Sequence, residues 1–243
     1  MLTTLTKIFV SIIISFFLLS CNANFNNDVT GKGEVISKEI VLNKDFDKIS
    51  IAMGWEVELI SSDENKIVMK ANKNLIPLLK YELDSGTLRI ESEKTINRAG
   101  SKLLKVYYTK PLSGYKTSSG SSLSSNEKIT VESLNIKTSS GSFLKLNIKT
   151  KDAEIKTSSG SSVELEGTAI NFNSKSSSGS ALNAKDLVVK NAKMKTSSGS
   201  SAIVDVKEYL EANTSSGSSI EYYGNPKKTK LKQSISGGEI TKR

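Results

Sequence analysis

The chain has 243 residues, with one cysteine, no histidine and 6% aromatic residues. Without histidine there is no Ser-His-Asp triad and no imidazole metal site, and one cysteine forms neither an internal disulfide nor a thiolate zinc site. The formal net charge of +9 is spread along the chain, unlike the dense basic pattern of nucleic-acid-binding proteins. Composition therefore predicts no cofactor, no metal and no nucleic-acid partner, and it disfavours most catalytic centres.

The first twenty residues have the pattern of an export signal. Lys7 is followed by the mostly apolar run Ile8–Leu19, which is too short to span a hydrocarbon core of about 30 Å and matches the apolar region of a signal peptide. The run ends in Leu18-Leu19-Ser20-Cys21, which resembles the lipobox of bacterial lipoproteins. We predict that residues 1–20 are a lipoprotein signal peptide and that Cys21 is lipidated. The alternative is a chance cysteine beside an ordinary cleavage site.

Residues 21–33 are polar and rich in asparagine, and we predict a flexible tether there. The residue after Cys21 is Asn22, and no acidic cluster follows it. This pattern favours a protein of the cell envelope that is anchored by lipid in the outer membrane. The sequence does not decide whether it faces the periplasm or the outside.

A short repeat organises residues 113–243. The string Thr-Ser-Ser-Gly-Ser begins at positions 117, 138, 157, 196 and 214, with a Ser-rich variant at 176–180. A period near twenty residues indicates stacked supersecondary units. The glycines of the repeat are separated by 21, 19, 19, 20 and 18 residues: Gly120, Gly141, Gly160, Gly179, Gly199 and Gly217.

Equivalent positions of the repeat identify the unit as a β-strand. Apolar residues recur at positions separated by two, which is the period of a strand and not of a helix. The position three residues after each glycine is always apolar: Leu123, Leu144, Val163, Leu182, Ala202, Ile220 and Ile240. The position five residues before it is mostly apolar: Tyr115, Ile136, Ile155, Ser174, Met194 and Ala212. We therefore predict an all-β fold, a β-solenoid with about 20 residues per coil.

The Ser-Gly pair should turn the chain at the corner of each coil. We expect glycine there because a side chain would clash or because the backbone requires positive φ. Three residues before each glycine lies a hydroxyl column that begins at Thr117 and is expected to face inward. Its stacked hydroxyls should bond one another along the rod.

A column of lysines should face outward, at Lys116, Lys137, Lys156, Lys175 and Lys195. Neighbouring ammonium groups about 4.8 Å apart repel by about 0.9 kcal/mol in water. One interpretation is a solvated strand face that prevents edge aggregation. The other is a cationic stripe for anionic glycans or lipid headgroups. A second outward column, with Asn147, Glu166, Lys185 and Asp205, alternates in sign and suggests a charge ladder between coils.

Residues 34–112 lack the strict repeat but also contain strand patterns. We expect Asp84-Ser85-Gly86 to be a hairpin turn, and the segment around Pro77 to be a break or a short helical turn. This half is either a set of irregular first coils or a capping head, since solenoids need protected ends. The expected strands are 34–42, 48–52, 56–60, 66–70, 80–83, 87–92 and 103–109.

Several short motifs, in order, resemble a known family of bacterial envelope proteins. They include Gly54-Trp55-Glu56-Val57-Glu58-Leu59, the segment Leu83–Ile90, the Ser-Gly-Ser coils, and Tyr223-Gly224-Asn225-Pro226 near the close. Over roughly residues 40–243 the chain is similar to the putative auto-transporter adhesin, head GIN domain family. The resemblance implies a single-stranded, right-handed β-helix-like fold, often behind a lipoprotein signal. It supplies no catalytic residues.

Three classes of function remain open. The first is a non-enzymatic, lipid-anchored envelope protein with an adhesin-like binding or scaffolding role, whose partner is an anionic glycan. The second is an envelope structural or stress-related component that acts through a protein partner. The third is a polysaccharide-acting β-helix enzyme, for which Glu164 and Glu166 would supply the two carboxylates. Lys145 and Lys185 are expected as the ion-pair partners of these carboxylates, so we favour a protein that is not an enzyme.

Overall fold

The computed structural model describes residues 28–243, of which most lie in strands. The chain is nearly all-β, with 69% strand and 3% helix, and stacked coils of about 19 residues form a β-solenoid of about 7 turns. The predicted fold class is therefore confirmed. The predicted signal peptide and the predicted lipidation site Cys21 lie outside the described residues.

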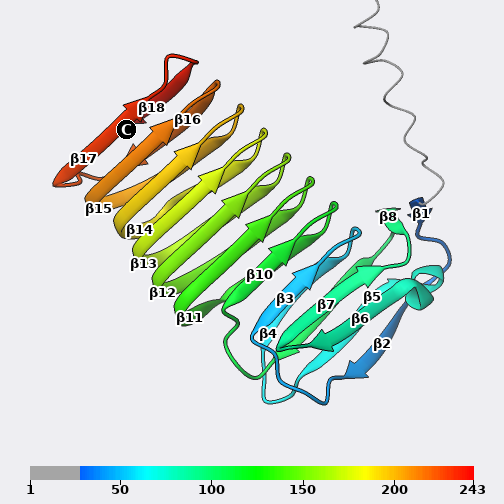
Figure 1. Cartoon of the computed structure of the whole chain (residues 1–243). Coiled ribbons are helices and arrows are strands. Elements are labelled where there is room, and N and C mark those ends of the chain that lie inside the picture. Colours follow the sequence, from blue (N-terminus) through cyan, green and yellow to red (C-terminus); the bar gives the residue numbers. More distant parts are fainter. Residues whose placement is uncertain (1–27) are drawn as a thin grey trace, which may run out of the picture.

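The regular coils occupy the C-terminal part of the chain, where each coil folds back on itself as a flattened loop (Figure 1). We call the strand segment after each Ser-Gly corner the first limb and the segment before the next corner the second limb. Each limb pairs in parallel with the same limb of the neighbouring coils. The strands are β10 (Gly114–Thr117), β11 (Ser122–Thr138), β12 (Phe143–Thr157), β13 (Ser162–Ser176), β14 (Ala181–Thr196), β15 (Ser201–Thr214), β16 (Ser218–Tyr223), β17 (Lys228–Gln233) and β18 (Gly238–Lys242).

The predicted inward columns fill the space between the two limbs. Leu123 pairs with Leu144 and Leu144 with Val163, and all three are buried. On the second limb, Ile136 and Ile155 stack in the same way. Burial of each aliphatic side chain contributes about 1.5–3 kcal/mol relative to exposure, so the stack of coils supplies one continuous core.

Each corner is a two-residue turn in which both central residues have positive φ. The serines before the glycines have φ between 51° and 54°, and the glycines have φ between 66° and 68°. In one turn Ser121 N–H donates to the Ser118 carbonyl over 3.2 Å, which is the geometry of a type I′ turn. A Cβ built on Gly160 would meet nothing within 4 Å. Positive φ is therefore the reason for glycine, and the expected clash is wrong at this position.

The hydroxyl column lies buried at the narrow corner, where the two limbs leave no room for large side chains. We expected these hydroxyls to bond one another along the rod, and that prediction is wrong. Most of them pair instead with a second column of hydroxyls, those of the serines directly after the glycines. Thr117 Oγ1 lies 3.0 Å from Ser142 Oγ of the next coil, and Thr157 Oγ1 lies 3.0 Å from Ser180 Oγ. The hydroxyl of Ser176 has no hydrogen-bond partner. A buried hydroxyl is costly without a partner, so this pairing suits the dry corner.

The head, residues 28–112, combines irregular coils with capping strands. Its strands are β1 (Asp28–Thr30), β2 (Val35–Val41), β3 (Lys48–Ile51), β4 (Glu56–Ser61), β5 (Lys66–Asn72), β6 (Leu79–Asp84), β7 (Thr87–Ser92), β8 (Thr95–Arg98) and β9 (Lys102–Tyr108), with the 3₁₀ helix η2 (Lys73–Leu78) between β5 and β6. Most match the expected strands within a few residues. The hairpin turn at Ser85 and Gly86 is confirmed, because β6 and β7 pair antiparallel across it.

Both limbs of the solenoid continue into the head. The second limb runs from β10 to β3 and β7 in parallel and ends with antiparallel β6. The first limb runs from β11 to β4 and β9 in parallel and ends with antiparallel β5 and β2. The head therefore combines the two arrangements that we considered, irregular first coils and a cap. Its parallel strands continue the coils, and its antiparallel strands cover the outer edges of these coils.

The start of the described chain differs from the sequence prediction. Asp28–Thr30 forms β1 and pairs in parallel with β8, although we expected residues 21–33 to be a flexible tether. Lys32 N–H also donates to Asn74 Oδ1 over 2.7 Å. Residues 28–33 therefore pack against the head through backbone hydrogen bonds and through bonds to the side chains of Asn72 and Asn74, which the polar composition does not reveal.

Candidate functional site

The predicted lysine column forms in register on the second limb. Lys116 stands opposite Lys137, followed by Lys156, Lys175 and Lys195 on successive coils. Strict parallel pairing places identical positions side by side about 4.8 Å apart. Their side chains point away from the core columns, and all but the half-buried Lys156 are exposed.

The structure extends this column in both directions. Ser50 of β3 stands opposite Lys116, and Arg89 of β7 stands opposite Ser50. At the other end, Asn213 follows Lys195, and Lys232 of β17 follows Asn213. The sequence analysis missed Arg89 because the head has no strict repeat. It could have been found only from the pairing of β7 with β3.

Few of these cations are neutralised by neighbours. Among residues 28–243, Lys156 is the one member of the lysine column with an ion pair, and its Nζ lies 2.7 Å from Glu154 Oε1. The hydrogen bond from Lys156, together with the charges of Lys156, Lys137 and Lys175, lowers the pKa of Glu154. The carboxylate therefore stays ionised below the usual range for glutamate and offsets part of the column's charge at its centre.

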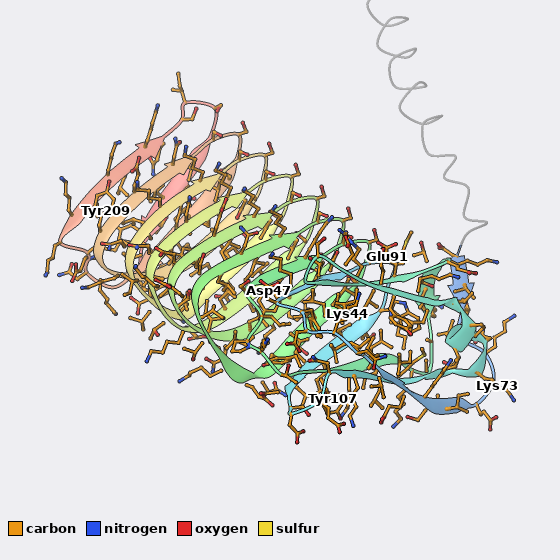
Figure 2. All side chains as sticks on the ribbon, turned by 60° about the horizontal axis from the view of Figure 1, so that its bottom comes forward. Lys44, Asp47, Lys73, Glu91, Tyr107 and Tyr209 are labelled. Atoms are coloured by element: carbon orange, nitrogen blue, oxygen red, sulfur yellow. The ribbon has the colours of Figure 1, made fainter. Side chains whose placement is uncertain are left out.

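Amide side chains lie on the same face as the lysine column, four residues away from it along each strand. Asn171 Nδ2 donates to Asp152 Oδ1 over 2.8 Å, and Asn191 Nδ2 donates to Asn171 Oδ1 over 3.2 Å. Tyr209 continues this row at β15, near the end of the solenoid remote from the head (Figure 2). These amides share their row with Asp152 and Tyr209. Between this row and the lysine column lies a further row, Asn135, Glu154, Asn173, Lys193 and Glu211. The second limb therefore presents amides and one phenol, which bind sugar hydroxyls, together with carboxylates, on the face that carries the ammonium groups.

The candidate carboxylate pair lies on the opposite, first limb. Glu164 Oε2 is 3.5 Å from Lys145 Nζ of the adjacent coil, as expected. Lys185 instead places its Nζ 4.9 Å from the centre of the Tyr223 ring, and Asp205 pairs with Lys207 at 2.8 Å. The expected charge ladder of the second outward column is therefore wrong, because an irregularity between Ala184 and Val188 shifts Lys185 out of register.

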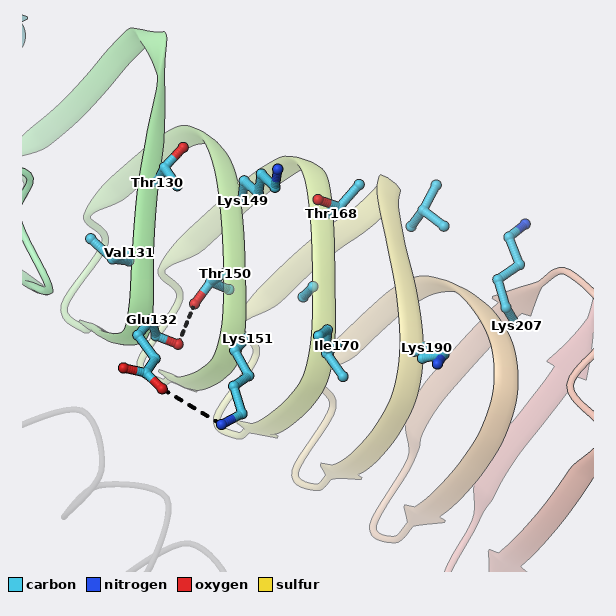
Figure 3. Close-up of a pocket in the computed structure, with 12 residues that line it drawn as sticks. Thr130, Val131, Glu132, Lys149, Thr150, Lys151, Thr168, Ile170, Lys190 and Lys207 are labelled. Carbon is cyan, nitrogen blue, oxygen red and sulfur yellow. Dashed lines mark hydrogen bonds and ion pairs between the residues drawn. The ribbon is translucent and has the colours of Figure 1, made fainter.

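A shallow groove of about 560 Å³ runs across the bends between the two limbs (Figure 3). Its floor includes the exposed side chains of Ile170 and Val188. The lysines of its rim are mostly neutralised, since Lys151 pairs with Glu132 at 3.5 Å and two others also have carboxylate partners: Lys190 with Glu208 and Lys207 with Asp205. The groove is thus mainly apolar, and Lys149 is the one lysine of its lining without an ion pair among residues 28–243.

Two other kinds of feature are absent from residues 28–243. Within residues 28–243, histidine, cysteine and carboxylate side chains nowhere gather in a group of three that could hold a metal ion. In the same part of the chain, no helix has the length and apolar character needed to cross a membrane.

These features define a class, a β-solenoid that displays stacked side-chain columns on a rigid outer face. A family model described as putative auto-transporter adhesin, head GIN domain, matches residues 45–226. The chain belongs to this family. No curated protein matches it.

Solved structures share the fold at low sequence identity. A putative adhesin from Bacteroides fragilis has a TM-score of 0.81 at 16% identity, over 88% of this chain and 100% of the other. One from Parabacteroides merdae has a TM-score of 0.69 at 18% identity, over 89% and 99%. A structure from Parabacteroides distasonis described as a putative lipid binding protein has a TM-score of 0.65 at 20% identity, over 89% and 99%. The family and most of these structures are described as adhesins, and none as an enzyme.

Proposed function

We propose that this protein is a non-enzymatic, lipid-anchored protein of the cell envelope with an adhesin-like binding role. Membership of the adhesin family supports the class, and the lipobox-like sequence before Cys21 supports the anchor. The observation that carries the binding role is the lysine column, whose five ammonium groups include four without an ion pair among residues 28–243.

The proposed ligand is an anionic glycan that lies along the column. Five positions separated by four strand spacings cover about 19 Å, which matches a polymer that presents repeated negative charges. Binding would release counterions, so affinity should fall as salt rises. Each exposed lysine should contribute little by itself, about 0.2–1 kcal/mol, and the effect should come from several together.

Isothermal titration of the purified protein against anionic polysaccharides and against acidic lipid vesicles, at two salt concentrations, tests this proposal. Replacing Lys137, Lys156 and Lys175 together with alanine should weaken binding and flatten its salt dependence. The melting temperature should stay level or rise as repulsion between coils is relieved. The matched control replaces three ion-paired lysines of the groove: Lys151, Lys190 and Lys207. Equal binding by the parent and the column variant would reduce the column to a solvated strand face.

The anchor has its own test. Cys21→Ser should release the protein from membranes or leave it unprocessed, since one thiol carries the proposed lipid. Metabolic labelling with a clickable fatty acid measures this directly. Labelling that survives the substitution would contradict the anchor.

A protein partner is the competing proposal, in which the rod is a structural or stress-related component of the envelope. It predicts that no anionic polymer binds and that a specific protein co-purifies from cross-linked cells. If replacing the lysines of the column changes this cross-linking, the partner protein binds the same face that we propose for the glycan.

A further inference from the structure

A second surface feature lies where the head meets the first regular coils. It is a hollow of about 420 Å³ between the second-limb strands β7, β3, β10 and β11. We call it the junction hollow. It is lined by Lys48, Ile49, Ser50, Thr87, Arg89, Ser113, Gly114, Tyr115, Lys116, Ser133, Asn135 and Lys137.

Small residues create this hollow. Ser50 stands between Arg89 and Lys116 in one row across the strands, and Gly114 stands between Lys48 and Asn135 in the next. A Cβ on Gly114 would lie 2.7 Å from Lys48 Cγ, and the φ of Gly114 is not in the left-handed region. Glycine is therefore needed here for space and not for backbone conformation, unlike the glycines of the coil corners.

The charge of the lining is one-sided. Four cations surround the hollow, Lys48, Arg89, Lys116 and Lys137, and no carboxylate lines it. Lys48 has one distant partner, with its Nζ 3.8 Å from Asp47 Oδ2. Arg89 stands opposite Glu82 of β6, but within residues 28–243 neither forms an ion pair.

Two other hollows of the described chain differ in this respect, whereas a third, of about 350 Å³, is lined by Lys116, Lys137, Lys156 and Lys175 and also lacks a carboxylate. The next hollow along the same face has one cation, Lys193, against Asp152 and Glu154. The groove at the bends has lysines that are mostly paired with carboxylates. Unlike the hollow lined by the lysine column, the junction hollow includes an arginine, Arg89. A guanidinium binds a planar carboxylate with two parallel hydrogen bonds, which an ammonium group does not.

We propose that the junction hollow binds one uronate unit of the anionic glycan, with the sugar carboxylate between Arg89 and Lys116 above Ser50. This inference rests on the proposed function and deepens it, because it gives the glycan a fixed starting point at the head end of the lysine column. The side chains of Ser133 and Asn135 supply groups for the sugar hydroxyls. The remaining units then follow Lys137 and the column beyond it.

The test uses the purified full-length protein and two probes, a galacturonate trimer and a long polygalacturonate. Arg89→Gln should weaken binding of the trimer about tenfold, the size expected when charge-assisted bonds to a carboxylate are lost. Arg89→Lys should recover only part, because it keeps the charge and loses the fork. Ser50→Asp, at a half-exposed position, should abolish trimer binding by placing a carboxylate in the hollow. Unchanged melting of each variant shows that the fold is intact.

The control is the distal variant, in which Lys175 and Lys195 are replaced with alanine. It should bind the trimer within about twofold of the parent, since exposed charges act weakly beyond a Debye length of about 8–10 Å, and should weaken only the long polymer. If Arg89→Gln and Lys195→Gln weaken trimer binding equally, the hollow is not a site, while a weakened polymer still supports the column. If inorganic sulfate displaces the trimer at equal concentration, the hollow is a general oxyanion site and the uronate assignment is overturned. If neither probe binds, both proposals fail.

Discussion

The head and the lysine column of the regular coils use charge in opposite ways, although the strands concerned belong to one sheet. In the head, cations meet carboxylates across neighbouring strands. Lys105 stands opposite Glu58 with 3.5 Å between Nζ and Oε2, and Lys80 Nζ lies 2.7 Å from Glu93 Oε1. In the coils, the second limb stacks five lysines on one another. Pairing of identical repeats in register brings like residues together, whereas irregular or antiparallel pairing lets unlike residues meet.

This contrast is the physical argument for the face on which we propose that a ligand binds. Opposite charges across strands stabilise a sheet modestly, and like charges destabilise it by a similar amount. The ion pairs between strands stabilise the head, whereas the stacked lysines destabilise one face of the coils. This cost, with few neutralising carboxylates, is the reason that we propose an anionic ligand on this face, which begins at the border between the two regions.

The largest expected effect comes from the core of the head. Trp55 is fully buried and its Nε1 donates to the Glu91 carbonyl over 3.0 Å. Trp55→Ala should lower the free energy of unfolding by about 3–5 kcal/mol, measured by chemical denaturation and circular dichroism. In the coils, Leu144→Ala is the matched change, at about 2–5 kcal/mol.

Those two variants also test whether the regions unfold together. Because both limbs run through head and coils, we expect a single transition in each variant, with one midpoint by circular dichroism and by proteolysis. Separate transitions would show that the head and the coils fold as independent units.

The next largest effect is a difference in stability between substitutions at two glycine turns, one in the head and one in the regular coils. Gly54 and Gly160 both have positive φ, 86° and 68°, but a Cβ on Gly54 would lie 2.5 Å from the Ile96 carbonyl oxygen, whereas Gly160 faces open space. Asparagine tolerates this backbone region. Gly160→Asn should therefore cost less than about 1 kcal/mol and Gly160→Val about 1–3 kcal/mol, from strain alone.

Gly54→Asn keeps the conformation but not the space, so it should cost more than Gly160→Asn, about 2 kcal/mol or more. Thermal melting of the three variants measures the difference. Equal losses at Gly54 and Gly160 would contradict the assignment of open space to the corners of the regular coils.

The hydroxyl pairs of the coils have no counterpart column in the head, and they should contribute less per residue than the cores. Thr157→Val removes the hydroxyl that faces Ser180 and should cost about 1–2 kcal/mol. Ser176→Thr should stabilise the protein by about 0.5–1 kcal/mol, because the unpartnered Ser176 hydroxyl would then follow the geometry of the paired threonines Thr117, Thr138, Thr157 and Thr196. By the same argument Thr157→Ser should lose part of its stabilisation, and a neutral Ser176→Thr would count against the pairing.

The smallest effect concerns Glu154. Its carboxylate pairs with Lys156 of the lysine column, as carboxylates pair with cations in the head. Glu154→Gln should raise affinity for a sulfated polymer about twofold to fivefold, the size of one exposed charge pair. Lys156 lowers the pKa of Glu154, so its carboxylate ionises above that lowered pKa and is neutralised only as pH falls through it. Binding of the sulfated polymer should therefore not change on this account between pH 7 and 5, which titration at both values checks.

Much of the regular half could be predicted from residues alone. The alternation of Tyr115, Thr117 and Leu123 around each Ser-Gly corner fixes which side chains face inward, because strand side chains alternate and a repeat near twenty residues returns to the same point of the coil. The lysine column follows from the same argument. Why glycine occupies the coil corners could be decided only from the structure. The sequence does not distinguish a position that requires positive φ from a position that has no space for a side chain.

The head was predictable as strands but not as an arrangement. Nothing in the local pattern shows that Thr87–Ser92 lies beside Lys48–Ile51, or that Asp28–Thr30 pairs with Thr95–Arg98. Likewise, the order of residues around Lys185 does not reveal the irregularity that moves it away from Asp205. These pairings depend on backbone bonds between distant segments, which any strand sequence can form.

The sequence by itself therefore determined the solenoid, its core columns, its family and the stripe of lysines, because a repeat converts position along the chain into position in space. The tertiary structure alone decided where that stripe begins. The residues around the junction hollow come from three distant segments of the chain, with Ser50 on β3, Arg89 on β7 and Lys116 on β10. Only the parallel pairing of these strands brings them around one hollow. Long-range strand pairing is set by the packing of the whole core, and this is information that no single segment contains.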